Sequence, residues 1–254
     1  MTAAFGRHGR WAHPRHAHTV AHRGNPPAAL WRRRVLLPGA LPSVTPKGLS
    51  EGASDNLTPV SQTLAIDGRP LGHRAQQTRR RLLGATYELL QSHGIRDVRV
   101  VEVARTVGTS PATFYQYFRD VDEAVLVLAD ELTEEVIPIA ALLDEPWNGK
   151  GGMDSARALV DRYFRFWDDH RAVMRVRNLA ADEGDPRFRD VRNRTLGQVT
   201  DRIAKTVAEN QKAGRVPPEI TPYSAAAAMV SMLERMASYH FDLEPRGVTR
   251  ADLV

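Results

Sequence analysis

From Ala75 onward, apolar residues recur along the chain at helical spacing. In residues 75–94 the apolar positions form one stripe, and Gly94 interrupts the pattern. The stripe comprises Leu82, Leu83, Thr86, Leu89 and Leu90. This spacing predicts a helix with one buried face.

The next apolar set, in residues 98–107, has features of both a strand and a helix. The segment is rich in β-branched residues, which favours a strand. However, its apolar residues also recur at positions i, i+3, i+4 and i+7, which is the helical template. These residues are Val100, Val103, Ala104 and Val107. We therefore predict a short helix from about Val100.

Helical patterns continue through the rest of the chain, without a convincing strand or an internal repeat of fixed period. The predicted helices cover residues 122–143, 153–170, 171–184, 187–213 and 223–241, and residues 248–254 resemble the start of another. Asp120 is the expected N-cap of the first of these helices. The predicted fold class is all-α.

Between the first two helices and this body lies the segment GTSPATFYQYF, residues 108–118. Gly108 permits the backbone angles that end the preceding helix. Ser110 can cap the following helix, and Pro111 suits its first position, where the missing N–H costs nothing. Two short helices joined by a tight turn that contains Gly predict a helix-turn-helix.

The second helix of this motif has two different faces. Phe114 and Phe118 share one face with Pro111, and they are expected to pack against the preceding apolar stripes. The opposite face carries small or hydrogen-bonding side chains without charge, namely Ala112, Thr113 and Gln116, flanked by Tyr115 and Tyr117. An ordinary helical hairpin is the alternative, but two exposed tyrosines beside a basic helix would be unusual for it.

The uncharged face has the chemistry needed to contact base edges. Gln116 can bond adenine, Thr113 can bond several bases, and Ala112 can contact a thymine methyl group. Tyrosine hydroxyls, Thr109, Ser110 and neighbouring Arg side chains suit phosphates, which position a protein without reading sequence.

These residues resemble the TetR family of one-component transcriptional regulators. The similarity is carried without a gap by LLGATYELLQSHG, VEVARTVGTS and PATFYQYF, which together span residues 82–118. It implies a DNA-binding head, here residues 73–119, on a variable all-α body for ligand binding and dimerisation, here residues 120–254. Double-stranded operator DNA and a second copy of the chain are the implied partners.

The resemblance also implies roles for single residues in the head. Phosphate contacts are implied for Arg99, Thr109 and Tyr115, and base contacts for Ala112, Thr113 and Gln116. Where the family often carries a phosphate-binding Lys after the recognition helix, this chain has Val121 between two aspartates. Arg119 is the residue that could take over this contact.

The body is rich in aromatic residues and methionine, which either fill a helical core or line an adaptable apolar pocket. Residues 164–175, 208–218 and 229–241 resemble regulators of the mycobacterial ethionamide-resistance type. That resemblance implies a hydrophobic channel lined by Tyr163, Trp167, Leu196, Val199, Val230 and Leu233. Leu233 stands where that subgroup has Asn. The composition leads us to expect a lipophilic effector, such as a fatty acyl or ester compound.

Dimerisation is expected to use the last two helices in a four-helix bundle, with small side chains at residues 224–229 allowing a close approach. Two heads are needed to reach half-sites one DNA turn apart. If the chain stops at Val254, the final helix barely begins, and a dimer weaker than the family norm is expected. A tight dimer at nanomolar concentration in sedimentation would contradict this.

Charge divides the chain into a basic front and an acidic body. Residues 1–72 carry a net charge of +6, residues 73–119 of +5 and residues 120–254 of −6. This distribution predicts a polyanionic partner for the basic part. Residues 1–72 are rich in Arg, His and Pro, and we expect them to form a disordered extension. Two interpretations of this extension remain: translation begins further into the sequence, or the extension is a basic arm that binds phosphates.

The remaining features exclude several classes of function. The absence of Cys excludes disulfides and thiolate metal sites and fits a reducing cytoplasm. Apolar runs are far shorter than the roughly 18 residues that a membrane span needs. No cofactor motif, metal-ligand spacing or converging acid–base pair indicates an enzyme, and salt bridges on solvated faces explain the Asp–His clusters near residues 168–170 and 240.

The sequence therefore predicts a sequence-specific DNA-binding regulator, by default a repressor, that a small lipophilic effector releases from a palindromic operator. The alternative is a non-specific nucleic-acid-binding protein that uses the basic arm and shows a steep salt dependence.

Overall fold

The computed structural model describes residues 70–144 and 149–254, so almost all of the predicted 1–72 extension lies outside the described residues. The elements in the described ranges are all helices, and the predicted all-α class is confirmed. They are α2 (His73–Ser92), α3 (Val100–Thr106), α4 (Pro111–Tyr115), α5 (Val121–Ala140), η1 (Ala141–Asp144), α6 (Gly149–Asp182), α7 (Pro186–Lys212), α8 (Pro222–Tyr239), η2 (His240–Asp242), η3 (Glu244–Arg246) and α9 (Arg250–Leu253).

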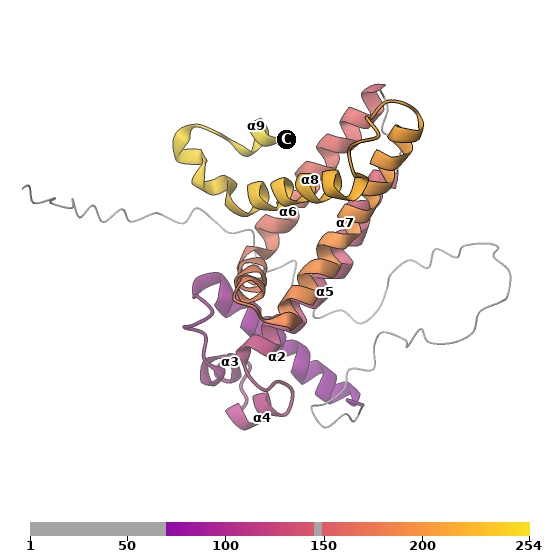
Figure 1. Cartoon of the computed structure of the whole chain (residues 1–254). Coiled ribbons are helices and arrows are strands. Elements are labelled where there is room, and N and C mark those ends of the chain that lie inside the picture. The colour runs from indigo at the N-terminus through magenta and orange to yellow at the C-terminus, as the bar shows by residue number, and fades with distance from the viewer. Residues whose placement is uncertain (1–69, 145–148) are drawn as a thin grey trace, which may run out of the picture.

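Helices α2, α3 and α4 form a small head at one end of the molecule, and α5 to α8 form a larger helical body (Figure 1). Helix α2 contacts α3 within the head and also contacts α5 and α6 of the body. Helices α5, α6 and α8 all pack on α7. The head is therefore attached to the body mainly through α2, while the division of the chain at residue 119 stays a prediction.

The start of α5 illustrates how local sequence sets an element boundary. Asp120 has extended backbone angles, and its Oδ1 accepts a hydrogen bond from the backbone N–H of Glu123 at 2.7 Å. Asp122 and Glu123 add negative charge to the first turn, which favours the positive end of the helix dipole. The predicted N-cap is confirmed.

Helix α6 is broken near its middle. His170 has φ −119° and ψ 16°, outside the helical range, so two helical segments meet there. The sequence pattern predicted separate helices with a boundary between residues 170 and 171, and the break confirms it.

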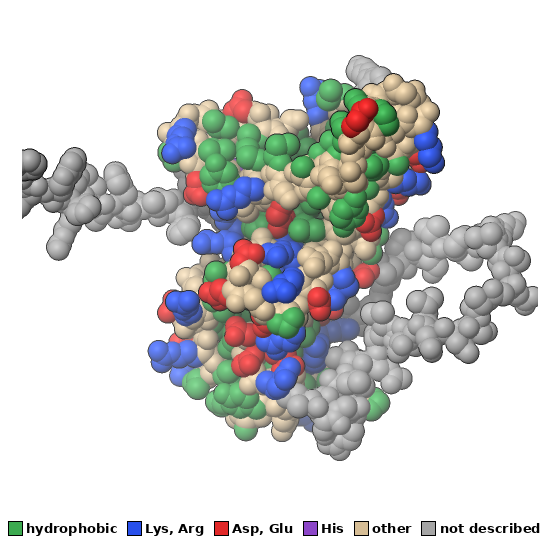
Figure 2. Space-filling model, in the orientation of Figure 1, with side chains coloured by type: hydrophobic (Ala, Val, Ile, Leu, Met, Phe, Trp, Pro, Cys, Tyr) green, Lys and Arg blue, Asp and Glu red, His purple; other side chains and the backbone are tan. Residues whose placement is uncertain are grey.

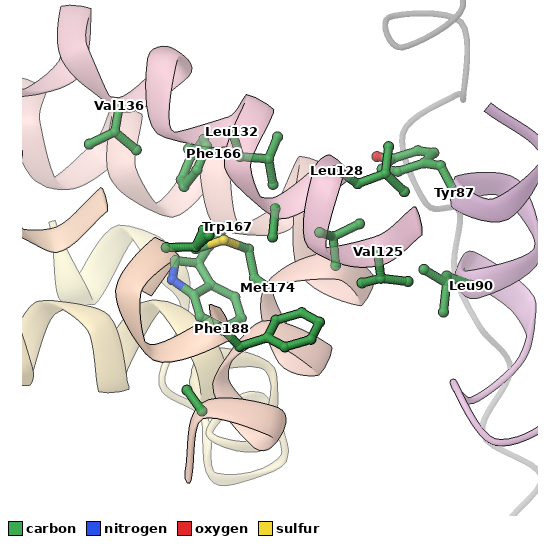
Figure 3. Close-up of a cluster of buried hydrophobic side chains, with 14 of the residues drawn as sticks. Tyr87, Leu90, Val125, Leu128, Leu132, Val136, Phe166, Trp167, Met174 and Phe188 are labelled. Atoms are coloured by element: carbon green, nitrogen blue, oxygen red, sulfur yellow. The ribbon is translucent and has the colours of Figure 1, made fainter. Parts of the chain in front are cut away.

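A continuous apolar core joins the head to the body, and Figure 3 shows its central part. Tyr87 and Leu90 of α2 face the apolar side of α5, where Val125 and Leu128 lie. Further along, the core takes in Phe166, Trp167 and Met174 from α6 and Phe188 from α7. Most described aromatics of the body therefore fill the core, whereas Tyr223, Phe241 and three of the methionines stay exposed.

Among residues 70–144 and 149–254, no helix combines the length and apolar character required to cross a bilayer. The same residues contain no group of three or more carboxylate or His side chains placed to hold a metal ion.

Candidate nucleic-acid interface and polar network

The turn between α3 and α4 begins at a left-handed glycine. Gly108 has φ 69°, and the N–H of Thr109 bonds back to the carbonyl of Ala104 at 2.9 Å, which closes α3. Arg81 of α2 donates from Nη2 to the carbonyl of Val107 at 2.6 Å. The end of α3 is thus held both by its own turn and by the neighbouring helix.

Ser110 caps α4, as the sequence predicted. Its Oγ accepts a hydrogen bond from the backbone N–H of Thr113 at 3.2 Å, and its hydroxyl lies 3.1 Å from the Thr113 hydroxyl. Pro111 occupies the first turn. The regular helix ends at Tyr115, earlier than expected, but N–H groups of Tyr117 and Phe118 still bond to the carbonyl of residue 114.

Two phenylalanines anchor this short helix to the head. Phe114 and Phe118 are 0% and 1% exposed, and their ring centroids lie 5.4 Å apart. They belong to the same apolar cluster as Leu82 and Leu83, so the predicted packing is confirmed. The guanidinium of Arg79 lies over the Phe118 ring at 5.2 Å and covers its outer side. With both rings buried, the opposite side of α4 must face outward.

The outward side carries the residues predicted to contact DNA. Ala112, Tyr115 and Gln116 are exposed, whereas Thr113 and Tyr117 are half-buried. Tyr115 keeps 53% of its surface exposed while its ring makes an edge contact with Phe114. Figure 1 shows α4 at the end of the molecule remote from α8. The structure brings these five side chains together on one accessible surface, and we call it the α4 face.

The predicted phosphate-binding residues around the α4 face differ in their exposure and in the contacts that they already make. Arg99 is exposed at the N-cap of α3, Ser110 is exposed, and Thr109 is half-buried. Arg119 is engaged within the chain, because its Nε lies 3.2 Å from Glu123 Oε2 and its backbone N–H donates to the same oxygen at 2.6 Å.

The Arg119–Glu123 pair has an electrostatic consequence. Burial alone would raise the pKa of the Glu123 carboxyl, but hydrogen bonds from Arg119 outweigh it and lower that pKa. The Arg119 side chain is 65% exposed, and exposed ion pairs contribute only about 0–1 kcal/mol. A phosphate can therefore compete for Arg119 at small cost. Figure 2 shows Arg and acidic side chains interspersed over the visible surface of the head.

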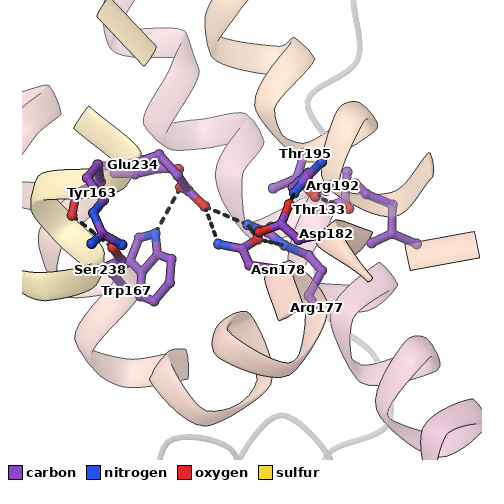
Figure 4. A network of polar contacts seen from close by, with 12 residues as sticks. Thr133, Tyr163, Trp167, Arg177, Asn178, Asp182, Arg192, Thr195, Glu234 and Ser238 are labelled. Carbon is purple, nitrogen blue, oxygen red and sulfur yellow. Dashed lines mark hydrogen bonds and ion pairs between the residues drawn. The ribbon is translucent and has the colours of Figure 1, made fainter. Parts of the chain in front are cut away.

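The body contains a buried polar network that the sequence did not predict (Figure 4). Glu234 of α8 accepts hydrogen bonds from four side chains of α6. The donors are the Tyr163 hydroxyl, Trp167 Nε1 at 2.9 Å, Arg177 Nη2 at 2.8 Å and Asn178 Nδ2 at 3.0 Å. The Arg177 side chain is 0% exposed and that of Glu234 only 13%. One carboxylate therefore satisfies donors from both segments of α6.

This network changes the character of the predicted hydrophobic channel. Tyr163, Trp167, Val199 and Val230 are buried, and Leu196 and Leu233 are half-buried. Tyr163 and Trp167 turn their polar atoms toward Glu234, so this part of the predicted lining is not purely apolar. Burial raises the pKa of the Tyr163 hydroxyl well above its usual value, and the negative charge of Glu234 raises it further, so the hydroxyl remains a donor.

The Asp–His clusters around His170 and His240 were expected to form salt bridges on solvated faces, and the structure agrees with only part of this expectation. Ion pairs are present, since His240 Nε2 lies 2.8 Å from Asp168 Oδ1 and His170 Nε2 lies 3.1 Å from Glu135 Oε2. His240, however, is only 2% exposed, so a solvated position was the wrong prediction for it. Folding of η2 back onto α6 buries its ring against Phe164, with centroids 5.3 Å apart.

Helix α8 presents an exposed apolar surface on its other side. Met229 and Met232 lie on this side and are 48% and 66% exposed, whereas Tyr223, 59% exposed near the start of the helix, projects from the opposite side to Met232. Figure 2 shows hydrophobic side chains gathered over this helix. Exposed apolar side chains gathered on one side of a helix are typical of a contact with another protein surface.

Two family models match the chain. The model for bacterial regulatory proteins of the tetR family matches residues 82–123, which include the whole helix-turn-helix. A model for the tetracyclin repressor-like C-terminal domain matches residues 140–254, which make up most of the body. The ethionamide-resistance subgroup is not distinguished by these matches and stays a prediction.

Several solved structures share the fold at low sequence identity. A tetR-family transcriptional regulator from Streptomyces coelicolor is 19% identical, with TM-score 0.55, and the match covers 72% of this chain and 77% of that one. The fatty acid degradation regulator FadR from Bacillus halodurans is 16% identical, with TM-score 0.51 and coverages of 71% and 90%. FadR from Bacillus subtilis, in complex with stearoyl-CoA, is 14% identical, with TM-score 0.51 and coverages of 65% and 88%.

These three structures support the fold, and the two family models cover the head and the body separately. The chain belongs to the TetR family of DNA-binding transcriptional regulators.

Proposed function

We propose that this regulator recognises a palindromic operator through the α4 face and represses transcription until a small lipophilic effector binds the body. Members of the family are DNA-binding regulators and not enzymes, and this applies to the chain as well. In this proposal Ala112, Thr113 and Gln116 contact base edges, while Tyr115 and Tyr117 bind phosphates together with Arg99, Thr109, Ser110 and Arg119.

The observation that carries the DNA-binding proposal is the orientation of α4. Burial of Phe114 and Phe118 leaves small and amide side chains on the accessible side, without a charge among them. Uncharged hydrogen-bonding groups discriminate bases by their donor and acceptor patterns, whereas charged groups mainly hold phosphates. The Ser110 cap adds rigidity, because it fixes the first turn of the helix.

Selection of bound duplexes from a random pool, followed by substitution, tests these roles. Gln116→Ala should relax base preference at one position of each half-site, at a cost of about 1–3 kcal/mol for the preferred base. Tyr115→Phe, which removes only a hydroxyl, should weaken binding to all duplexes alike. If neither variant changes affinity or preference in a gel-shift titration, the α4 face does not contact DNA.

The effector is proposed to be lipophilic, with a polar group. Support comes from the mixed character of the predicted lining, in which Val199 of α7 and Val230 of α8 are buried and apolar while Tyr163 and Trp167 bond to Glu234. The FadR structure from Bacillus subtilis holds stearoyl-CoA, which combines a long acyl chain with a polar carrier. A ligand of that type would be compatible with both parts of the lining.

A thermal-shift screen of the full chain against acyl-CoAs, free fatty acids, apolar drugs and polar metabolites tests this class. A true effector at one hundred times its Kd should stabilise the protein by about 2.7 kcal/mol. Leu233→Trp, which adds volume at a half-buried lining position, should abolish that shift without removing the helix. Stabilisation by polar metabolites alone would refute a lipophilic effector.

A homodimer is the proposed functional unit, formed through the exposed surface of α8. Met229 and Met232 give this surface its apolar character, and the small residues 224–228 allow two helices to approach closely. A dimer pairs two α4 faces for a symmetric operator.

Since the chain acts on DNA, the cytoplasm is the proposed location. The alternative arm-mediated mode involves residues 1–72, nearly all of them outside the described residues, and nothing in the comparisons supports it.

A further inference from the structure

Three consecutive residues at the break in α6 make contacts with four other elements, η2, α9, α5 and α2. Asp168 accepts from His240 Nε2 at 2.8 Å and from Arg250 Nη1 at 3.3 Å, which brings the C-terminal segment onto the break. His170 lies within 3.1 Å of Glu135 on α5. The residue between them, Asp169, accepts a hydrogen bond at its carbonyl oxygen from Tyr87 of α2.

The hydroxyl of Tyr87 on α2 donates to the carbonyl oxygen of Asp169 at 2.5 Å. In a regular helix, a carbonyl bonds to the N–H four residues later. The φ of −119° at His170 tilts the preceding carbonyl away from the helical direction, so an outside donor can approach it. Tyr87 is 5% exposed, and its ring also makes an edge contact with His170. Burial, followed by the charges of Asp169 and Glu135, raises the pKa of the Tyr87 hydroxyl, which keeps it a donor.

The geometry of the break also depends on Glu234. Its donors lie on both sides of His170, since Tyr163 and Trp167 precede the break while Arg177 and Asn178 follow it. One carboxylate on α8 therefore bridges the two helical segments that meet at residue 170. A disturbance at Glu234 is transmitted first to the break.

On the head side, Tyr87 lies one helical turn after Leu83. Leu83 is 1% exposed and belongs to the same apolar cluster as Phe114 and Phe118, which orient α4. A shift of α2 at Tyr87 would therefore reach α4 through the contacts of a close-packed core, which transmits strain.

We propose that Tyr87 is the positioning residue that couples the Glu234 network to the DNA-binding head, through the Asp169 carbonyl exposed by the break in α6. The inference rests on the proposed function, because its output is the position of the α4 face. It names the contact by which occupancy of the body would regulate DNA binding.

A double-mutant cycle on the full chain tests the coupling, using the duplex that the unaltered protein selects. Tyr87→Phe and Tyr163→Phe each delete one hydroxyl and preserve the ring. Each should weaken DNA binding by about five- to tenfold, at the lower end of the range typical of coupling between two sites. The DNA affinity of the double variant should be at most about twofold lower than that of the single variant with the lower affinity. The two effects should not multiply, because both substitutions interrupt the same path. Tyr239→Phe, a matched control that retains the stacking of Arg235, should bind DNA normally.

Hydrogen exchange gives a second readout that requires no DNA. Tyr87→Phe should accelerate amide exchange in α2 and α3, while Tyr239→Phe should not. Multiplicative effects in the cycle, or unchanged affinity in Tyr87→Phe, would overturn the coupling while leaving the proposed function intact. If the unaltered chain selects no duplex, the proposed function fails, and unchanged exchange in Tyr87→Phe would then separately overturn the Tyr87 link.

Discussion

Replacing Glu234 with Gln is expected to destabilise the protein by about 3–5 kcal/mol, because it leaves a buried charge without its partner. The Arg177 side chain is 0% exposed and pairs with Glu234 at 2.8 Å. An amide in place of the carboxylate cannot neutralise the guanidinium, and its NH₂ group would face donors such as Trp167 Nε1. The loss of the negative charge and the loss of hydrogen-bond acceptors both lower the free energy of unfolding.

Urea unfolding, with Asp130→Asn as the control, measures this effect. Asp130 also pairs with an Arg, Arg194, but both side chains are more than half exposed, at 56% and 55%. The control substitution should therefore cost about 0–1 kcal/mol. Equal midpoints for the two variants would show that Glu234 does not balance Arg177, contrary to the network in Figure 4.

The second large effect is expected from Phe114→Ala, which should cost about 3–5 kcal/mol, as is usual for truncation of a buried Phe. Phe114 is fully buried and, with Phe118, orients α4. Its loss removes the attachment of a helix of only five residues, which cannot be stable alone. We expect the head to lose order and DNA binding to fall below detection, while the body keeps its helices.

Tyr115→Ala separates folding from contact with DNA. Tyr115 is adjacent to Phe114 but 53% exposed, so its truncation should change stability by no more than about 0.5 kcal/mol. It should nevertheless weaken DNA binding, since the proposed phosphate contact is removed. Near-native hydrogen exchange of the head in Phe114→Ala would contradict the anchoring role of that ring.

Local sequence rules were sufficient for most of the architecture. The caps at Ser110 and Asp120 and the turn at Gly108 all follow from short-range chemistry that involves residues a few positions apart. The burial of Phe114 and Phe118 follows from helical spacing. The roles of the α4 face in DNA contact stay predictions, because spacing alone does not establish which surface meets a ligand.

The polar network could not be derived in the same way. Glu234 is 56–71 residues from the four donors that it joins, so no periodicity within one helix relates them. Nothing in the sequence pattern of α6 or α8 sets Arg177 or Glu234 apart from the other charged residues of these helices. Only the packing of α8 on α6 makes both polar groups buried partners.

The left-handed turn at Gly108 limits how this regulator can vary. A Cβ atom added there would meet nothing within 4 Å, so space around the turn is ample. The barrier to substitution comes instead from the backbone, since left-handed angles cost an L-residue about 1–2 kcal/mol. Small and large side chains at position 108 should thus be disfavoured to a similar degree, with Asn the best tolerated. The size of the side chain therefore has little influence on which residues this turn can contain.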